Sequence, residues 1–100
     1  MNREEAVEFA TANNVLLSRP DGVRFLSAIN GVTLELSRAV QKHGSMHGPH
    51  EGYAVILEEL DELWDEVKAQ HPDRERLRSE ACQVAAMALR FMVDVCEPGA

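Results

Sequence analysis

Carboxylate side chains are concentrated in one short segment. Between Glu58 and Glu66, six of nine consecutive residues are acidic, and the next basic residue is Lys68. Like charges four residues apart destabilise an isolated helix by a few tenths of a kcal/mol per pair. A bound divalent cation would offset this repulsion. Such a run usually forms a solvated helix face, and a metal site is the alternative.

The spacing of these residues sharpens the metal hypothesis. At about 100° per residue, Glu59, Glu62 and Glu66 share one row of a helix. This row flanks the apolar stripe of the same segment, so Glu59 and Glu62 are expected to point into a groove against a neighbouring helix. Glu58 is expected to point more towards solvent.

A second polar pair follows on the next predicted helix. Glu80 and Gln83 lie three residues apart and share a face. If the two helices are antiparallel neighbours, Glu80 and Gln83 converge with Glu59 and Glu62. Three carboxylates and one amide oxygen favour Mg²⁺, or alternatively Mn²⁺, with water and phosphate as the remaining ligands.

Helices must position these side chains. Apolar spacing, glycines and prolines predict four of them, over residues 3–18, 23–43, 50–70 and 74–96. Asp73 is expected to cap the last helix, and Pro98 and Gly99 to close the chain. No alternating strand pattern is found. We therefore predict an all-α four-helix bundle that forms one domain over residues 1–100.

Apolar residues of the last two predicted helices define the expected core. Trp64 is expected to be a core or interface residue rather than a base-stacking platform. The stripe of the third helix is Tyr53, Ile56, Leu57, Leu60, Leu63, Trp64 and Val67. The expected core seam of the fourth helix is Ala81, Val84, Ala85, Ala88 and Met92.

Composition limits the classes of function. The net charge of −7 argues against broad binding to nucleic acid backbones, but a divalent cation can still bridge carboxylates to a nucleotide. A domain of 100 residues buries a smaller share of its surface than a large domain does, and packing against a second copy would ease this shortage.

Location is predicted from cysteine placement and hydropathy. Cys82 and Cys96 are expected on one helix, too far apart to bridge, which fits a reducing compartment. No apolar run approaches the roughly 20 residues of a membrane span, and no leader pattern follows Met1. We therefore expect a cytoplasmic protein.

Two motifs together resemble a known family. Glu58-Glu59-x-x-Glu62 followed by Glu80-x-x-Gln83 is similar to the EExxE and ExxD pattern of the MazG-like, all-α nucleotide pyrophosphohydrolase superfamily. Residues 50–57 and 80–88 look like a small single-domain branch found in phages and bacteria. The resemblance covers about residues 25–95.

The resemblance implies a fold and an activity. It implies a helical bundle of the NTP pyrophosphatase type, completed by oligomerisation as a homodimer or homotetramer. It also implies Mg²⁺-dependent cleavage of nucleoside triphosphates to monophosphate and pyrophosphate. By the same resemblance Glu59, Glu62 and Glu80 are metal ligands, and Glu58 lies behind them or positions water.

The chain departs from the family pattern at Gln83, where the family has Asp. A Gln oxygen ligates a hard cation but adds no charge, so the site holds metal more weakly or holds fewer ions. The alternative function is therefore a non-catalytic helical module that binds nucleotide or a partner protein. A purely structural bundle with a solvated acidic face is the third hypothesis.

Other residues have weaker assignments. Lys42 and Arg90 are candidate substrate-binding residues, with ordinary surface charge as the alternative for Lys42. Arg90 is expected to pair with the acidic cluster or to reach phosphates from a neighbouring subunit. His43, His47 and His50 have zinc-like spacing, but the glycines and proline among them argue against that site.

Overall fold

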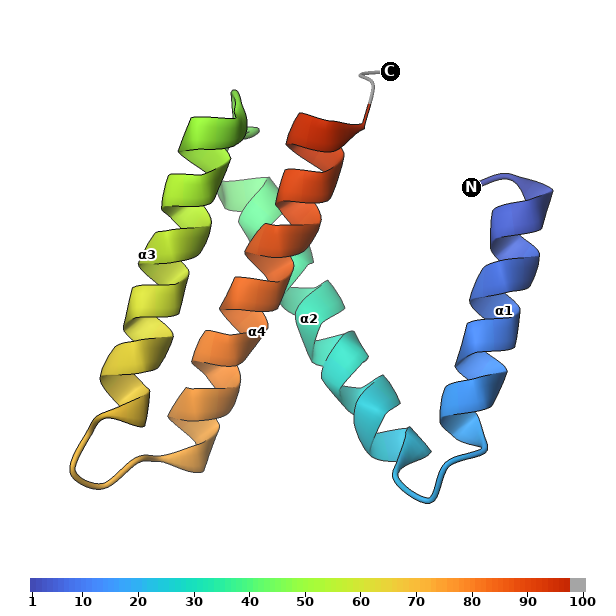
Figure 1. The fold of residues 1–100 in the computed structure, drawn as a ribbon, viewed down its shortest axis with the longest axis horizontal. Helices are drawn as coiled ribbons and strands as arrows, with labels where there is room; N and C mark the ends of the chain where they lie inside the picture. Colours follow the sequence, from blue (N-terminus) through green and yellow to red (C-terminus); the bar gives the residue numbers. More distant parts are fainter. Residues whose placement is uncertain (98–100) are drawn as a thin grey trace. The chain divides into compact units, whose positions relative to one another are not determined.

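The computed structural model describes residues 1–97, and these residues are all-helical, as predicted (Figure 1). The helices are α1 (Arg3–Leu17), α2 (Gly22–Lys42), α3 (Pro49–Val67) and α4 (Arg74–Phe91), and α4 continues into a short π-helix (Met92–Cys96). No strand occurs among the described residues. None of their helices combines the length and apolar character needed to cross a bilayer. The predicted ending at Pro98 and Gly99 lies outside the described residues.

The chain forms two compact units, residues 1–30 and residues 31–100, the second described as far as residue 97. In the first unit, Asn2 and Glu5 form a reciprocal capping box that satisfies the first amides of α1. At the start of α2, a side chain on Gly22 would collide with the Leu16 carbonyl oxygen, so the tight turn requires glycine there. The prediction of one domain over residues 1–100 stays a prediction.

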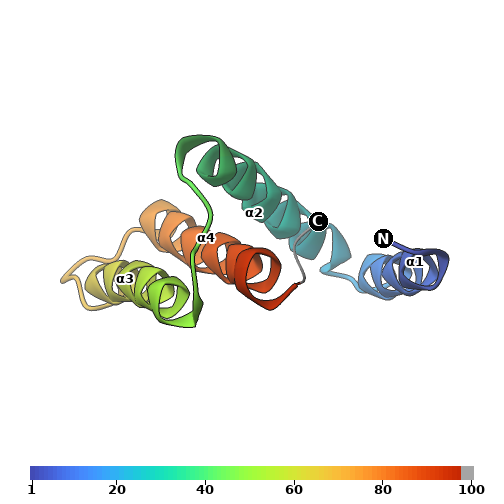
Figure 2. The same cartoon turned by 90° about the horizontal axis from the view of Figure 1, so that it is seen from above.

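In the second unit, α3 and α4 run antiparallel and side by side (Figures 1 and 2). Their close approach depends on Gly52, because a Cβ there would lie 2.5 Å from the Phe91 ring. Asp73 caps α4 as predicted, accepting the Glu75 amide at 2.8 Å. This antiparallel hairpin is the geometry that the proposed convergence of the two polar motifs requires.

Two helix ends differ from the sequence prediction. α3 ends at Val67 rather than near Gln70, because the Ala69 amide bonds the Glu66 carbonyl in a tightened last turn. Pro72 then excludes a continuing helix. The predicted fourth helix spans the right residues, but its last turn is a π-helix that closes with the Glu97 amide on the Met92 carbonyl.

The predicted core seam of α4 is wrong for most of its length. Ala81, Ala88 and Met92 are exposed, whereas Ala86 and Arg90 are buried. Both sides of α4 carry small or apolar residues, so hydropathy alone did not distinguish them. The buried side is the one that meets the end of α2.

Candidate metal centre

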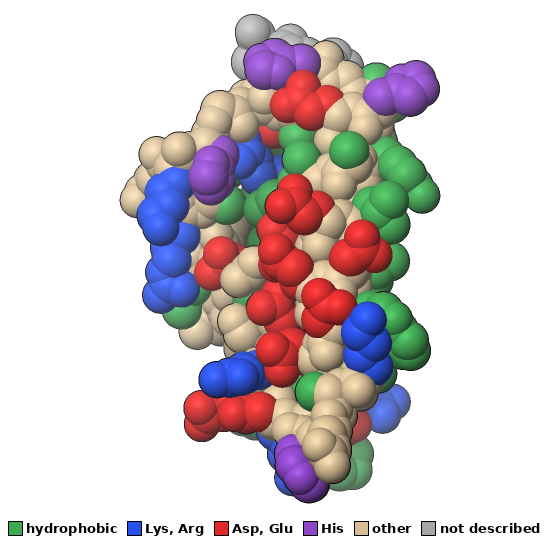
Figure 3. Space-filling view, turned by 90° about the vertical axis from the view of Figure 1, so that its left-hand side faces the viewer, with side chains coloured by type: hydrophobic (Ala, Val, Ile, Leu, Met, Phe, Trp, Pro, Cys, Tyr) green, Lys and Arg blue, Asp and Glu red, His purple; other side chains and the backbone are tan. Residues whose placement is uncertain are grey.

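Three glutamates from two helices converge in the second unit. Glu59 and Glu62 lie one turn apart on α3, and Glu80 extends from α4. One carboxylate oxygen from each residue lies within 4.8 Å of the other two. Figure 3 shows the acidic side chains as a column along this side of α3. The structure therefore brings together three of the four residues that the sequence nominated as metal ligands.

The electrostatics of this cluster favour a compensating positive charge. Burial, followed by repulsion from Glu62 and a hydrogen bond with it, raises the pKa of Glu59 to about 7. Burial and the charge of Glu62 also raise the pKa of Glu80. Glu59 therefore titrates near neutral pH, and a bound cation would favour its ionised form.

Two oxygens of the cluster lack partners. Glu59 Oε2 and Glu80 Oε2 are buried and accept no hydrogen bond within residues 1–97. Buried polar atoms are normally satisfied, so unpaired oxygens at one point call for an explanation. A hard divalent cation fits this donor set, because Mg²⁺ and Mn²⁺ prefer carboxylate oxygens and keep positions for water and phosphate.

A pocket of about 690 Å³ adjoins the cluster and shares Glu59 with it. Its walls are the end of α2, the following loop, α3 and α4, all from the second unit. In Figure 3, basic side chains lie to the left of the acidic column. The sequence-nominated residues on the pocket wall are Lys42, Glu58, Glu59, Gln83 and Arg90.

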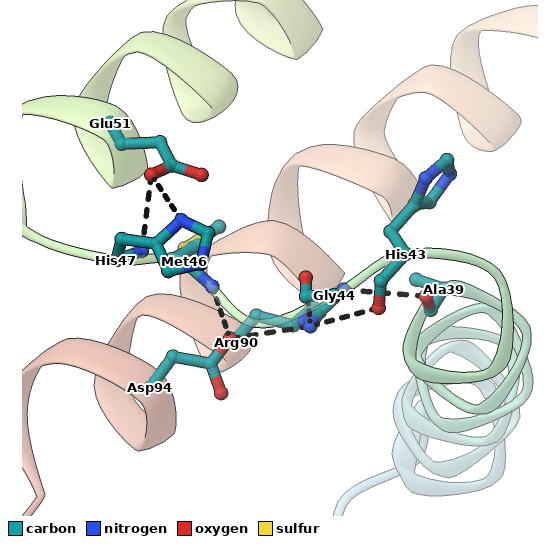
Figure 4. A network of polar contacts seen from close by, with 8 residues as sticks. All are labelled: Ala39, His43, Gly44, Met46, His47, Glu51, Arg90 and Asp94. Atoms are coloured by element: carbon teal, nitrogen blue, oxygen red, sulfur yellow. Dashed lines mark hydrogen bonds and ion pairs between the residues drawn. The ribbon is translucent and has the colours of Figure 1, made fainter.

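Arg90 is a buried clamp between α4 and the end of α2 (Figure 4). Its guanidinium donates to the Gly44 carbonyl at 2.9 Å and to the Ala39 carbonyl at 3.3 Å. A cation is favourable at this place, because carbonyl groups are left over at a helix C-terminus. Its charged partner is Asp94 at 3.3 Å rather than the acidic cluster. A direct contact of Arg90 with substrate stays a prediction.

Sequence reasoning missed the second half of this clamp. Asp94 also accepts the Met46 amide at 3.0 Å, which fixes the loop after α2 to the π-helical turn. The four-residue spacing of Arg90 and Asp94 was the available signal. Pocket-lining Glu35 was also missed, although it is a charge within the apolar pattern of α2.

The histidines do not form a metal site in the described part of the chain. Among residues 1–97, the group of three or more metal-ligating side chains is the glutamate cluster. His47 is exposed, and its Nδ1 contacts Glu51 at 2.9 Å. The zinc alternative therefore has no geometric support there.

No protein-family model, curated protein or solved structure matches this chain.

Proposed function

We propose that this chain is a MazG-like, Mg²⁺-dependent pyrophosphohydrolase that converts NTP or dNTP to the monophosphate and pyrophosphate. The observation that carries the proposal is the convergence of Glu59, Glu62 and Glu80 around two unpaired buried oxygens, beside a pocket of about 690 Å³. Small-molecule pockets typically span 300–1,000 Å³, so the volume suits a nucleotide.

The acidic residues have two parts in this proposal, metal binding and proton transfer. Glu59, Glu62 and Glu80 would hold the cation, and Gln83 would contribute a neutral oxygen from the pocket wall. Bound Mg²⁺, or Mn²⁺, would neutralise the phosphates and make water more acidic. Glu58, on the same wall, orients water and accepts its proton. The water oxygen joins one phosphorus as the bond between the α- and β-phosphates breaks.

The opposite wall supports an anionic substrate. Arg38 and Lys42 extend from the last turns of α2 into the lining of the pocket, across from Glu58 and Glu59. Cationic side chains there would bind the outer phosphates, while the metal serves the inner ones. The expected setting is the cytoplasm, where Cys82 and Cys96 stay free thiols, as in the structure.

A non-catalytic nucleotide-binding module is the second candidate. Gln83 favours it, because the amide removes one negative charge from the set that the family pattern supplies. In this case the pocket and the cluster would bind metal and nucleotide together without turnover.

The test is an assay of purified protein with a panel of NTPs and dNTPs, measuring pyrophosphate and monophosphate separately. We expect release of both products with Mg²⁺ or Mn²⁺, none with chelator, and a loss of at least about 100-fold in Glu62→Gln. Asp61→Asn is the matched control, because Asp61 neighbours Glu62 on α3 but lies outside the cluster.

Two results would separate the candidates. Metal-dependent nucleotide binding by calorimetry, without product in any condition, would establish the binding module and reject the enzyme. Neither product nor binding, in protein with an intact helical circular dichroism spectrum, would reject both candidates and leave a structural bundle.

A further inference from the structure

The pocket beside the glutamate cluster extends well past the cluster along α3. Its lining residues on this helix run from Glu59 back to Glu51, about 12 Å at the helical rise of roughly 1.5 Å per residue. On α4 they run from Gln83 forward to Arg90, because the two helices are antiparallel. The pocket therefore has an acidic end, at Glu59 and Gln83, and a loop end, at Glu51 and Arg90.

The wall between these two ends is apolar. Val55 and Met87 line it from α3 and α4, and the buried Met46 lines it from the loop. Such a wall suits the flat ring of a nucleobase and offers it no hydrogen bond. With the phosphates between the acidic end and α2, which is the premise taken from the proposed function, the nucleoside is the part of the substrate that lies along this wall.

One carboxylate oxygen at the loop end is open to a ligand. Glu51 Oε2 accepts the His47 backbone amide at 3.2 Å and lies 2.9 Å from His47 Nδ1, which holds the carboxylate in place (Figure 4). Because a carboxylate is an acceptor, Nδ1 carries the proton of this contact. Glu51 Oε1 has no such partner in the described part of the chain. The side chain is 48% exposed, so a ligand in the pocket reaches this oxygen.

The strongest donor at the loop end is already engaged. Arg90 donates to the Ala39 and Gly44 carbonyls. It also pairs with Asp94, and its remaining Nε is buried. The Ser45 hydroxyl on the pocket wall can donate or accept, so it does not discriminate between ligands. The open carboxylate oxygen is therefore the group that can select a base.

We propose that Glu51 selects nucleotides whose base carries an exocyclic amino group. A carboxylate accepts hydrogen bonds and donates none, so it attracts the amino group of cytosine, adenine or guanine. Uracil has a carbonyl oxygen where cytosine has this amino group, and two acceptors repel each other. The ring N–H of uracil lies between two carbonyl oxygens, so a carboxylate that approached it would meet both. Since the two bases share one ring size, cytosine and uracil isolate the effect of Glu51.

The kcat/KM values of the full chain for CTP and UTP with Mg²⁺ test this selection. We expect a preference for CTP of at least about 10-fold, as for a hydrogen bond to a charged group. Glu51→Gln should bring the two values to within about threefold of each other, because an amide offers both a donor and an acceptor. Glu75→Gln is the matched control, since Glu75 also lies in the first turn of a helix but does not line the pocket. It should keep the preference of wild type.

Three results would overturn the selection by Glu51. Equal kcat/KM values for CTP and UTP in wild type would do so and leave the pyrophosphohydrolase intact. An equal loss for both nucleotides in Glu51→Gln would also do so, because Glu51 would then hold the sugar or the fold. If no product forms, equilibrium dialysis with CTP, UTP and Mg²⁺ makes the same comparison. Tighter binding of CTP that Glu51→Gln removes would support base selection and reject the enzyme, whereas equal or absent binding would reject both.

Discussion

Glu59 joins the acidic cluster to the pocket. Its place on α3 was predictable from helical spacing, because Glu59 and Glu62 lie three residues apart. Its protonation was not predictable, since burial against α4 is the largest cause of the raised pKa and depends on how two helices pack. A row of carboxylates in the sequence indicates candidates, and the packing of the two helices decides which of their pKa values rise.

The raised pKa of Glu59 makes stability depend on pH. With a pKa of about 7 in the folded state and 4.5 as its ordinary value, the folded state binds more protons between these limits. The free energy of unfolding should therefore fall as pH rises through this window in the presence of chelator. Glu59→Gln should remove this dependence and be more stable than wild type at pH 8 by roughly 1 kcal/mol, after allowing for solvent screening.

Urea denaturation at several pH values measures this effect. Asp61→Asn serves as the control and should keep the pH dependence of wild type. Saturating Mg²⁺ should reverse the trend, because metal binds the ionised carboxylate. A wild-type stability that stays flat from pH 5 to pH 8 in chelator, a range that covers the folded-state titration, would contradict the expectation.

Arg90 stabilises the fold through backbone carbonyls. Arg90→Met should lower the free energy of unfolding by about 3 kcal/mol, because it leaves Asp94 and the carbonyls at the end of α2 without their buried partner. Thermal or chemical denaturation provides the measurement.

Arg38→Met is the matched control for Arg90. The Arg38 side chain is 68% exposed and meets Glu35 at 3.5 Å, so its loss should change stability by under about 0.5 kcal/mol. Equal losses of unfolding free energy in Arg90→Met and Arg38→Met would contradict a special stabilising role of the buried Arg90 contacts.

At the scale of helices, substitution by alanine should change stability in opposite directions at two glycines that lie within helices. In α3, Gly52→Ala puts a methyl group 2.5 Å from the Phe91 ring, and should cost roughly 1–3 kcal/mol despite the better helix propensity. In α2, Gly31→Ala meets only Arg78 Nη2 at 3.8 Å, and should stabilise by about 0.5–1 kcal/mol. Denaturant midpoints of the two variants measure the difference, and a stabilised Gly52→Ala would disprove the close approach of α3 and α4.

Helix positions were largely predictable because their signals are local. The helices are separated at Pro20, Pro49 and Pro72, and Asp73 caps the last of them. The helices begin within one residue of their predicted starts. The end of α3 and the π-helical turn were not predictable. Both depend on backbone hydrogen bonds whose spacing differs by one residue from that of an α-helix, such as the bond from the Glu97 amide to the Met92 carbonyl. A hydropathy pattern contains no information on such a change.

At the scale of the molecule, the side of α4 that faces inward was the largest error. The row of Ala81, Ala85, Ala88 and Met92 has ideal core character, yet three of these four residues are exposed and Ala85 is half-buried. A single sequence cannot distinguish burial within one chain from burial between chains, because both select the same apolar residues.

The two-sided character of α3 also limits changes of length. One inserted residue between Leu60 and Asp61 would turn everything after it by about 100°. Glu62 would then no longer lie on the same helix face as Glu59. The same insertion would move Trp64 and Val67 off the face of Leu57. Insertions and deletions should therefore be confined to the connection at residues 68–73, where α3 has already ended and nothing depends on helical phase.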